Sequence, residues 1–175
     1  MRLELVDPSR GTDPSITATA IIRDRQSGEI LSHFGEGCYY FSLYTEDDIV
    51  YVLGTKSKPP MLCGDTILLF ESRDLKTWSS RELFSRPGWQ YFNTSLTKGP
   101  DGYRLLLEAN EPRELVGVPF TFFFASSPDL VSWTHLPPET AFSKHRYMGG
   151  PWMKYSRGWY YVISVTELPC QRYSN

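Results

Sequence analysis

Three glutamates occupy positions where carboxylate chemistry is possible. Glu108 and Glu167 each follow a run of apolar residues at nearly the same place in two repeats of the sequence, and Glu36 sits between Gly35 and Gly37. Two carboxyl groups that face one substrate can act as general acid and general base. Glycine neighbours permit unusual φ/ψ values and close approach of the backbone, which favours a site role for Glu36. These three glutamates are our candidate catalytic residues, and the competing interpretation is that they are solvated residues at strand ends.

Several other side chains could hold a ligand near the same places. Tyr39, Tyr40 and Trp152 offer flat faces on which a ring could stack, although such residues also pack between sheets. Asn93 brings an amide to the start of an expected strand. Arg146 could reach a hydroxyl or a carboxylate, or it could be a charge on a surface loop. These five residues are our candidate substrate-binding set.

One segment of the chain recurs and indicates the elements that position these residues. Ser72-Arg-Asp-Leu-Lys-Thr-Trp78 returns 55 residues later as Ser127-Pro-Asp-Leu-Val-Ser-Trp133, each time after an apolar strand. A fixed repeat period close to this length indicates stacked supersecondary units, and strand-like units suggest β-propeller blades. We expect each copy to be a turn between the third and fourth strands of a blade. Trp78 and Trp133 should then fill equivalent, largely buried positions between blades.

The predicted fold is an all-β propeller built from four-stranded antiparallel blades. We expect a single domain over residues 1–175, with an incomplete unit at 1–38, two units at 39–92 and 93–148, and another incomplete unit at 149–175. Residues 1–16 suggest an irregular lead-in, followed by strands at 16–22 and 29–34. In the third unit the strands are expected at 93–98, 103–108, 119–126 and 132–136.

Propeller geometry predicts that the candidate site residues converge. The first strand of each blade lines the central channel, and the second strand runs antiparallel to it. The start of strand one and the end of strand two therefore meet at the same mouth. The repeats place Tyr40, Asn93 and Gly150 near the first position, and Glu108 and Glu167 near the second.

The stretch from Cys38 to Glu167 resembles the five-bladed β-propeller glycoside hydrolases of family 43 and its relatives, most closely their uncharacterised hydrolase-like members. The resemblance rests on the Ser-x-Asp-Leu-x-x-Trp turn and on a small residue plus Pro followed by Gly and aromatic residues. Gly150-Pro151 with Gly158-Trp-Tyr-Tyr161 is the best example. It implies a carbohydrate ligand and hydrolysis by a pair of carboxyl groups, with inversion and without a cofactor.

The sequence departs from this family at the catalytic aspartates. The family places Asp before Pro at the channel end of certain blades, and the matching positions here are Tyr40, Thr94 and Gly150. The aspartates could lie in further blades, because a closed five-bladed ring at this repeat length needs on the order of 270 residues. Alternatively, Glu36, Glu108 and Glu167 serve instead, or the protein binds sugars without cutting them.

Three functions follow as hypotheses. The first is a hydrolase-like propeller acting on a glycan, and the second is a non-catalytic sugar-binding propeller. The third is a protein-interaction propeller, which the absence of a Trp-Asp dipeptide and the long repeat disfavour. We also expect the 175 residues to be part of a longer propeller, so that the chain alone should self-associate or be only marginally stable.

The composition excludes other classes of function. The 18 basic and 20 acidic residues give a net charge of −2 without a basic stripe, which argues against nucleic acid and membrane partners. No metal-type or cofactor motif occurs, so we expect neither group. Cys38, Cys63 and Cys170 have unrelated spacings and should be buried or free thiols. Neither a signal peptide nor a membrane-length apolar run occurs, which leaves the location unknown and the cytoplasm as the default expectation.

Overall fold

The computed structural model describes residues 1–7, 17–118, 120–142 and 144–166. They form four successive antiparallel sheets, as the sequence predicted. The first sheet holds β1 (Arg2–Val6), β2 (Thr19–Arg23) and β3 (Ile30–Phe34). The second holds β4 (Cys38–Glu46), β5 (Ile49–Lys56), β6 (Thr66–Ser72) and β7 (Ser79–Ser85). The third holds β8 (Gln90–Gly99), β9 (Gly102–Glu111), β10 (Thr121–Ser127) and β11 (Thr134–His135), and the fourth holds β12 (Met148–Ser156) and β13 (Trp159–Thr166).

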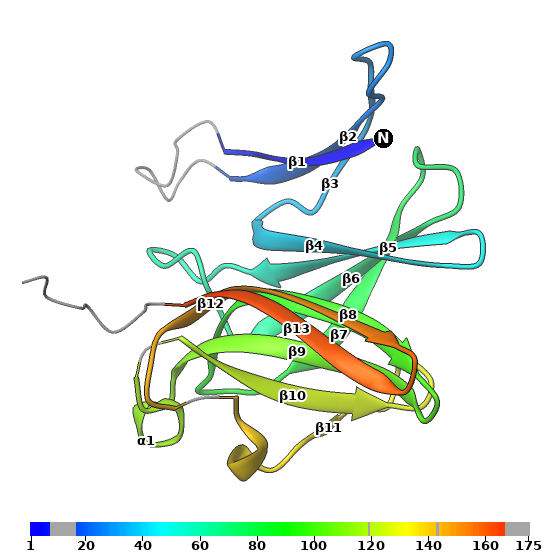
Figure 1. Ribbon diagram of the computed structural model, residues 1–175. Coiled ribbons are helices and arrows are strands. Elements are labelled where there is room, and N and C mark those ends of the chain that lie inside the picture. The colour runs from blue at the N-terminus through cyan, green and yellow to red at the C-terminus, as the bar shows by residue number, and fades with distance from the viewer. Residues whose placement is uncertain (8–16, 119, 143, 167–175) are drawn as a thin grey trace, which may run out of the picture.

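The second and third sheets are simple meanders, in which the spatial order of the strands is their order in the chain. Their first strands, β4 and β8, lie next to each other, and β12 of the fourth sheet lies against β8 (Figure 1). Short polar bonds join these strands. The hydroxyls of Ser42 and Thr94 are 3.1 Å apart, and the backbone N–H of Met153 donates to Ser95 Oγ at 2.9 Å. The first strands therefore lie together on one side of the molecule, as the first strands of propeller blades do around the central channel.

An apolar core fills each space between consecutive sheets. The largest core lies between the second and third sheets and contains fully buried residues such as Leu69, Tyr91 and Leu105. Cys38, Val52 and Phe70 lie between the first two sheets, and Leu106, Phe122 and Met153 lie between the last two. The second and third sheets are thus covered on both faces, which explains why their two inner strands carry apolar runs rather than a strict alternation.

In both copies of the repeated turn, an aspartate accepts two backbone N–H groups. Asp74 Oδ1 accepts the N–H groups of Lys76 and Thr77 at 2.8 Å, and Asp129 Oδ1 accepts those of Val131 and Ser132 at 2.8 and 2.7 Å. The residue after each aspartate is a leucine with positive φ, 63° for Leu75 and 62° for Leu130. These backbone bonds hold the pKa of both aspartates below its usual range, to about 2 for Asp74. The turn is therefore set by local side-chain bonds, as expected.

The first sheet carries a third version of this turn that the sequence comparison missed. Asp24 Oδ1 accepts the N–H groups of Gln26 and Ser27 at 2.8 Å, between β2 and β3. The surrounding letters differ from Ser-x-Asp-Leu-x-x-Trp, so only the position of the aspartate between two strands could have revealed it.

The two tryptophans of the repeat occupy equivalent spaces between sheets. Trp78 packs with the core between the first and second sheets, stacks on Phe34 at 4.0 Å and donates its Nε1–H to Ser32 Oγ. Trp133 packs on the core between the second and third sheets. Both are partly buried, so the expectation of largely buried rings was too strong.

The prediction for the first 16 residues was wrong in part. Arg2–Val6 is a strand, β1, that pairs with β2 from Arg2↔Arg23 to Val6↔Thr19, where we expected an irregular lead-in. Its Leu3 packs against the core between the first two sheets, and this contact is not visible in the local sequence. The rest of the lead-in, residues 8–16, lies outside the described residues. Within the described ranges, no helix is long and apolar enough to cross a membrane.

Candidate functional site

A β-bulge recurs at the same place in three sheets. In each first strand, two residues oppose one residue of the second strand, where the register shifts. The three sets are Tyr40 and Phe41 opposite Gly54, Phe92 and Asn93 opposite Glu108, and Gly150 and Pro151 opposite Ser164. Bulges bend a strand and re-aim its side chains, and they are common next to active sites. The bulges bring Tyr40, Asn93, Gly150 and Glu108 to one end of the neighbouring first strands.

Glu108 is the buried charge-bearing group at this end. Its residue is 3% exposed, at the point where β9 faces the bulge of β8. Asn93 Nδ2 donates to Glu108 Oε2 at 2.9 Å, and the backbone N–H of Gly150 donates to the same oxygen at 3.0 Å. Both of these hydrogen bonds end on Oε2, and Oε1 has no hydrogen-bond partner among the described residues.

The environment of Glu108 favours its protonated form. Burial raises the pKa of this carboxyl, and the hydrogen bonds from Asn93 and Gly150 oppose the shift but do not cancel it. No neighbouring carboxylate among the described residues contributes to the shift. Glu108 is therefore a lone buried acid rather than one member of a close carboxylate pair.

Aromatic rings form a continuous row beside Glu108. Consecutive ring centroids are 6.3 Å apart for Tyr39–Tyr40, 5.3 Å for Tyr40–Phe92, 4.8 Å for Phe92–Phe120 and 5.5 Å for Phe120–Tyr147. Burial raises the pKa of Tyr40, and the nearby Cys63 and Glu108 raise it further. The row contains three phenolic groups, those of Tyr39, Tyr40 and Tyr147, and Tyr40 lies near the buried acid.

Two members of the row have strained backbone. Tyr40 has φ 55° at the first bulge position and Phe120 has φ 62°, a left-handed region that bulky residues rarely adopt. Such strain persists only where the surrounding structure enforces it, and it clusters at functional sites. At the same bulge position in β12, Gly150 has φ 59°, and its N–H points at Glu108.

Small residues make room for the bulges. A Cβ added to Gly54 would lie 2.7 Å from the Phe41 ring, and one added to Gly149 would lie 2.5 Å from the Tyr147 hydroxyl. Gly54 and Ser164 stand where β9 has Glu108, so the carboxyl is particular to the third sheet.

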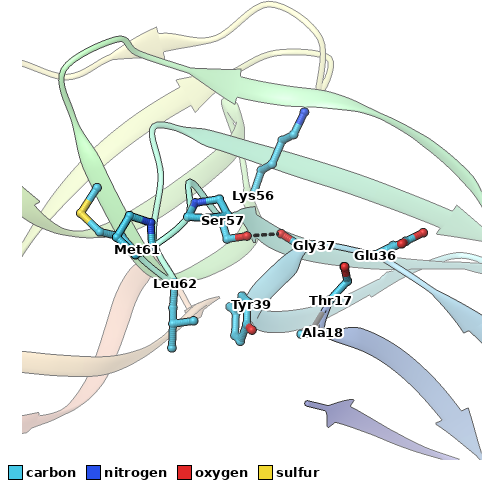
Figure 2. Close-up of a pocket in the computed structure, with 11 residues that line it drawn as sticks. Thr17, Ala18, Glu36, Gly37, Tyr39, Lys56, Ser57, Met61 and Leu62 are labelled. Atoms are coloured by element: carbon cyan, nitrogen blue, oxygen red, sulfur yellow. Dashed lines mark hydrogen bonds between the residues drawn. The ribbon is translucent and has the colours of Figure 1, made fainter. Parts of the chain in front are cut away.

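Glu36 lines a cavity that does not include Glu108. This cavity, of about 240 Å³, lies where the start of β4 meets the end of β5, with Glu36, Tyr39, Lys56 and Met61 in its wall. Figure 2 shows the Glu36 and Lys56 side chains pointing in different directions, and Ser57 donating to the carbonyl of Gly37. Glu36 is solvent-exposed, so its environment does not resemble that of Glu108.

The remaining candidates are spread more widely. Tyr39 donates to Asp7 Oδ2 at 3.4 Å and connects the pocket with the aromatic row. Arg146 is exposed in the segment before β12, and Trp152 is 50% exposed on β12. Glu167 and Cys170 lie outside the described residues. Cys38 and Cys63 are buried free thiols, in agreement with the interpretation from their spacing.

Sequence reasoning missed Phe92 and Phe120, whereas it named Tyr147 as a residue that could stack on a sugar ring. Phe92 directly precedes Asn93, and we did not expect a site role for it because we assumed a regular strand. The bulge instead turns Phe92 toward Tyr40. Phe120 and Tyr147 come from segments that flank β10 and β12, and only the fold brings them together. The described residues hold no cluster of His, Cys, Asp and Glu suited to a metal ion.

Comparison with known proteins addresses the fold. No family model and no curated protein sequence matches the chain. Among solved structures, a family 32 β-fructofuranosidase of Bombyx mori matches 91% of this chain and 38% of its own, with a TM-score of 0.57 and 16% identity. The chain has the fold of the β-propeller glycoside hydrolases.

Two further structures support this fold. An α-L-arabinanase of Penicillium chrysogenum, complexed with arabinobiose, matches 81% of this chain and 45% of its own, with a TM-score of 0.54 and 16% identity. A family 93 α-L-arabinofuranosidase of Fusarium graminearum with arabinobiose matches 81% and 46%, with a TM-score of 0.55 and 15% identity. The chain spans less than half the length of each of these structures.

Proposed function

We propose that this chain recognises a glycan at the end of the first strands where Glu108 lies. The observation that carries the proposal is the buried carboxyl of Glu108, fixed through Oε2 by Asn93 and the Gly150 N–H. A fixed carboxyl with a free oxygen can bond a sugar hydroxyl with defined geometry. Burial makes such a bond strong, because little water competes for it.

The aromatic row supplies the second component that a sugar site needs. Sugar rings have apolar faces that stack on aromatic side chains, and their hydroxyls need polar partners at the edge. Tyr40 and Phe92 bring ring surface next to Glu108. The similar structures with arabinobiose and the β-fructofuranosidase suggest arabino- and fructo-oligosaccharides as the ligands to try first.

Hydrolysis is the second candidate, and the raised pKa of Glu108 favours it. A general acid must hold its proton near the working pH, and burial moves Glu108 in that direction. A glycosidase of the paired type also needs a second carboxyl group, roughly 5 to 10 Å away. No such partner influences Glu108 among the described residues, so recognition is the function that this geometry supports best.

Calorimetric titration with arabino- and fructo-oligosaccharides tests the proposal. Glu108→Gln keeps the shape of the side chain and an oxygen for Asn93 and Gly150, but it removes the ionisable group. At neutral pH we expect it to weaken binding by roughly tenfold, since a hydrogen bond to a charged group contributes about 1.5–3 kcal/mol and one to a neutral amide about 0.5–1.5 kcal/mol.

Glu82→Gln is the matched control, because Glu82 is exposed on β7, the outermost strand of the second sheet. It should bind as the wild type does. Equal binding by the Glu108 variant, or no binding by the wild type, would contradict the proposal. Release of reducing sugar by the wild type, lost in Glu108→Gln, would extend recognition to hydrolysis.

A further inference from the structure

The cavity that contains Glu36 has both apolar and charged walls. Its volume is about 240 Å³, and it lies where the start of β4 meets the end of β5. In Figure 2, Met61 and Leu62 lie on one side of it, Glu36 lies on the opposite side, and Lys56 extends from the end of β5 between them. An apolar wall with a few polar groups is the usual construction of a small-molecule site.

Backbone hydrogen bonds fix the walls of this cavity. The carbonyl of Gly37 accepts the N–H and the hydroxyl of Ser57, both at 2.9 Å. The loop that follows is closed by the N–H of Met61, which donates to the Lys58 carbonyl at 2.9 Å, and by the N–H of Lys58, which donates to the Cys63 carbonyl at 3.0 Å. A ligand therefore meets walls that are already in place, which lowers the ordering cost of binding.

Glu36 and Lys56 are left to bond a ligand. No ion pair joins either of them to another described residue, and their side chains point in different directions. A carboxylate only accepts hydrogen bonds and an ammonium only donates them, whereas a hydroxyl does both. A unit with several hydroxyls can thus bond both groups, while an ion of either sign would be repelled by one of them. The charges of the cavity favour a neutral polyhydroxyl unit.

Tyr39 joins this cavity to the site at Glu108. Its ring lines the cavity and also begins the aromatic row, 6.3 Å from the ring of Tyr40, which lies near Glu108. The strand register gives the same relation, because Gly54 on β5 stands where β9 has Glu108, and Lys56 follows two residues later. The cavity and the buried carboxyl therefore lie at the same end of their sheets and share one row of rings.

We propose that the cavity beside Glu36 and Lys56 is a second subsite, which takes one neutral sugar unit of the glycan that binds at Glu108. This inference rests on the proposed function. Pockets for drug-sized ligands measure about 300–1,000 Å³, so a cavity of about 240 Å³ fits a single sugar unit rather than a longer piece of chain. Glu36 and Lys56 would bond its hydroxyls, and Met61 and Leu62 would cover its apolar face. The protein should then prefer oligosaccharides long enough to reach from Glu108 past Tyr39.

Calorimetric titration with oligosaccharides of increasing length tests the inference. We use arabino- and fructo-oligosaccharides from the disaccharide to the hexasaccharide. The affinity of the wild type should rise at the length that reaches the cavity and then stay level. Lys56→Met keeps the apolar stem but removes the ammonium, so it should weaken the long oligosaccharides by roughly tenfold and leave the disaccharide unchanged.

Leu62→Trp is a second variant that fills the cavity instead of changing its charge. It should remove the gain in affinity with length. Lys76→Met is the matched control, because Lys76 is an exposed lysine in the turn between β6 and β7, away from the cavity. It should show the same length dependence as the wild type, and circular dichroism should show that all variants are folded.

The length series separates failure of this inference from failure of the proposed function. A wild type that binds every length equally well, or variants Lys56→Met and Leu62→Trp that keep the gain with length, would overturn the second subsite and leave recognition at Glu108 intact. A disaccharide weakened by Lys56→Met as much as the hexasaccharide would also overturn it. Glu108→Gln should weaken every length, the disaccharide included, and a wild type that binds no oligosaccharide would overturn both proposals.

Discussion

Glu108 combines burial with hydrogen bonds to a single oxygen, and this pairing has consequences for stability as well as for binding. Its folded-state pKa is raised, so the folded protein holds this proton more tightly than the unfolded chain does. The resulting stabilisation is fully present below the ordinary value of 4.5 and is lost as the pH rises through the folded-state pKa. Near neutral pH, the protein with this buried acid is therefore less stable than a variant with a neutral amide at position 108.

Glu108→Gln is therefore expected to gain stability relative to the wild type as the pH rises above 4.5. Urea unfolding at several pH values measures this difference in the free energy of unfolding. Glu82→Gln should show no such trend, because Glu82 is exposed on β7. A difference that is constant with pH would mean that Glu108 titrates like a surface carboxylate.

His135 should give the opposite pH trend. Burial lowers the pKa of its imidazole. Nε2 is buried and has no hydrogen-bond partner among the described residues, while Nδ1 lies 2.8 Å from the carbonyl oxygen of Leu136. The unfolded chain binds this proton more tightly, so stability should fall as the pH drops below 6.5. His135→Phe keeps a ring beside Trp89, and thermal melts should show that it removes this loss; an unchanged acid profile would contradict the assignment.

At the scale of elements, the repeat made the blades predictable. The Ser-x-Asp-Leu-x-x-Trp segment specifies its turn through bonds within a few residues, so the sequence carries the whole signal. The bulges were not predictable, because they depend on close packing between neighbouring strands, as Phe41 of β4 against Gly54 of β5 shows. The register of the repeats was enough to predict that Glu108, Asn93 and Gly150 lie together. That Phe120 joins the aromatic row could be seen only in the folded structure.

The tryptophans of the repeat provide a test at this scale. Trp78→Ala should cost about 2 to 3 kcal/mol of unfolding free energy, below the range for a fully buried ring because Trp78 is only partly buried. Trp133→Ala should cost less, since Trp133 lacks the stacked Phe34 and the hydroxyl partner of Trp78. Denaturant melts measure both costs. Val131→Ala, in an exposed turn, should stay within about 0.5 kcal/mol, and a comparable loss there would show that the tryptophans have no special role.

At the scale of the whole molecule, the sheets should differ in stability. The second and third sheets are covered on both faces, and the first and fourth are the ends of the row (Figure 1). Local opening is easiest where few apolar contacts must break. Amide hydrogen exchange should therefore be slowest in β5, β6, β9 and β10 and fastest in β1 and β13. Uniform protection across all strands would contradict this order.

At this scale the chain corresponds to part of the propellers that it resembles. It spans less than half the length of the similar hydrolase structures, so activity at a complete channel stays a proposal. The sequence anticipated the blades because the repeat is local. It could not show how the first strands meet, because those contacts join residues more than 50 positions apart, as between Ser42 and Thr94.

The central claim is that a glycan binds beside Glu108, and an NMR titration tests it most directly. The Gly150 N–H and the Asn93 side-chain amide both donate to Glu108 Oε2, so a sugar that bonds this carboxyl must change their signals. We predict saturable shifts of these two groups on addition of arabino- or fructo-oligosaccharide, and their loss in Glu108→Gln. Signals that stay unchanged at these two groups, or shifts confined to β7 and the outer turns, would contradict the account.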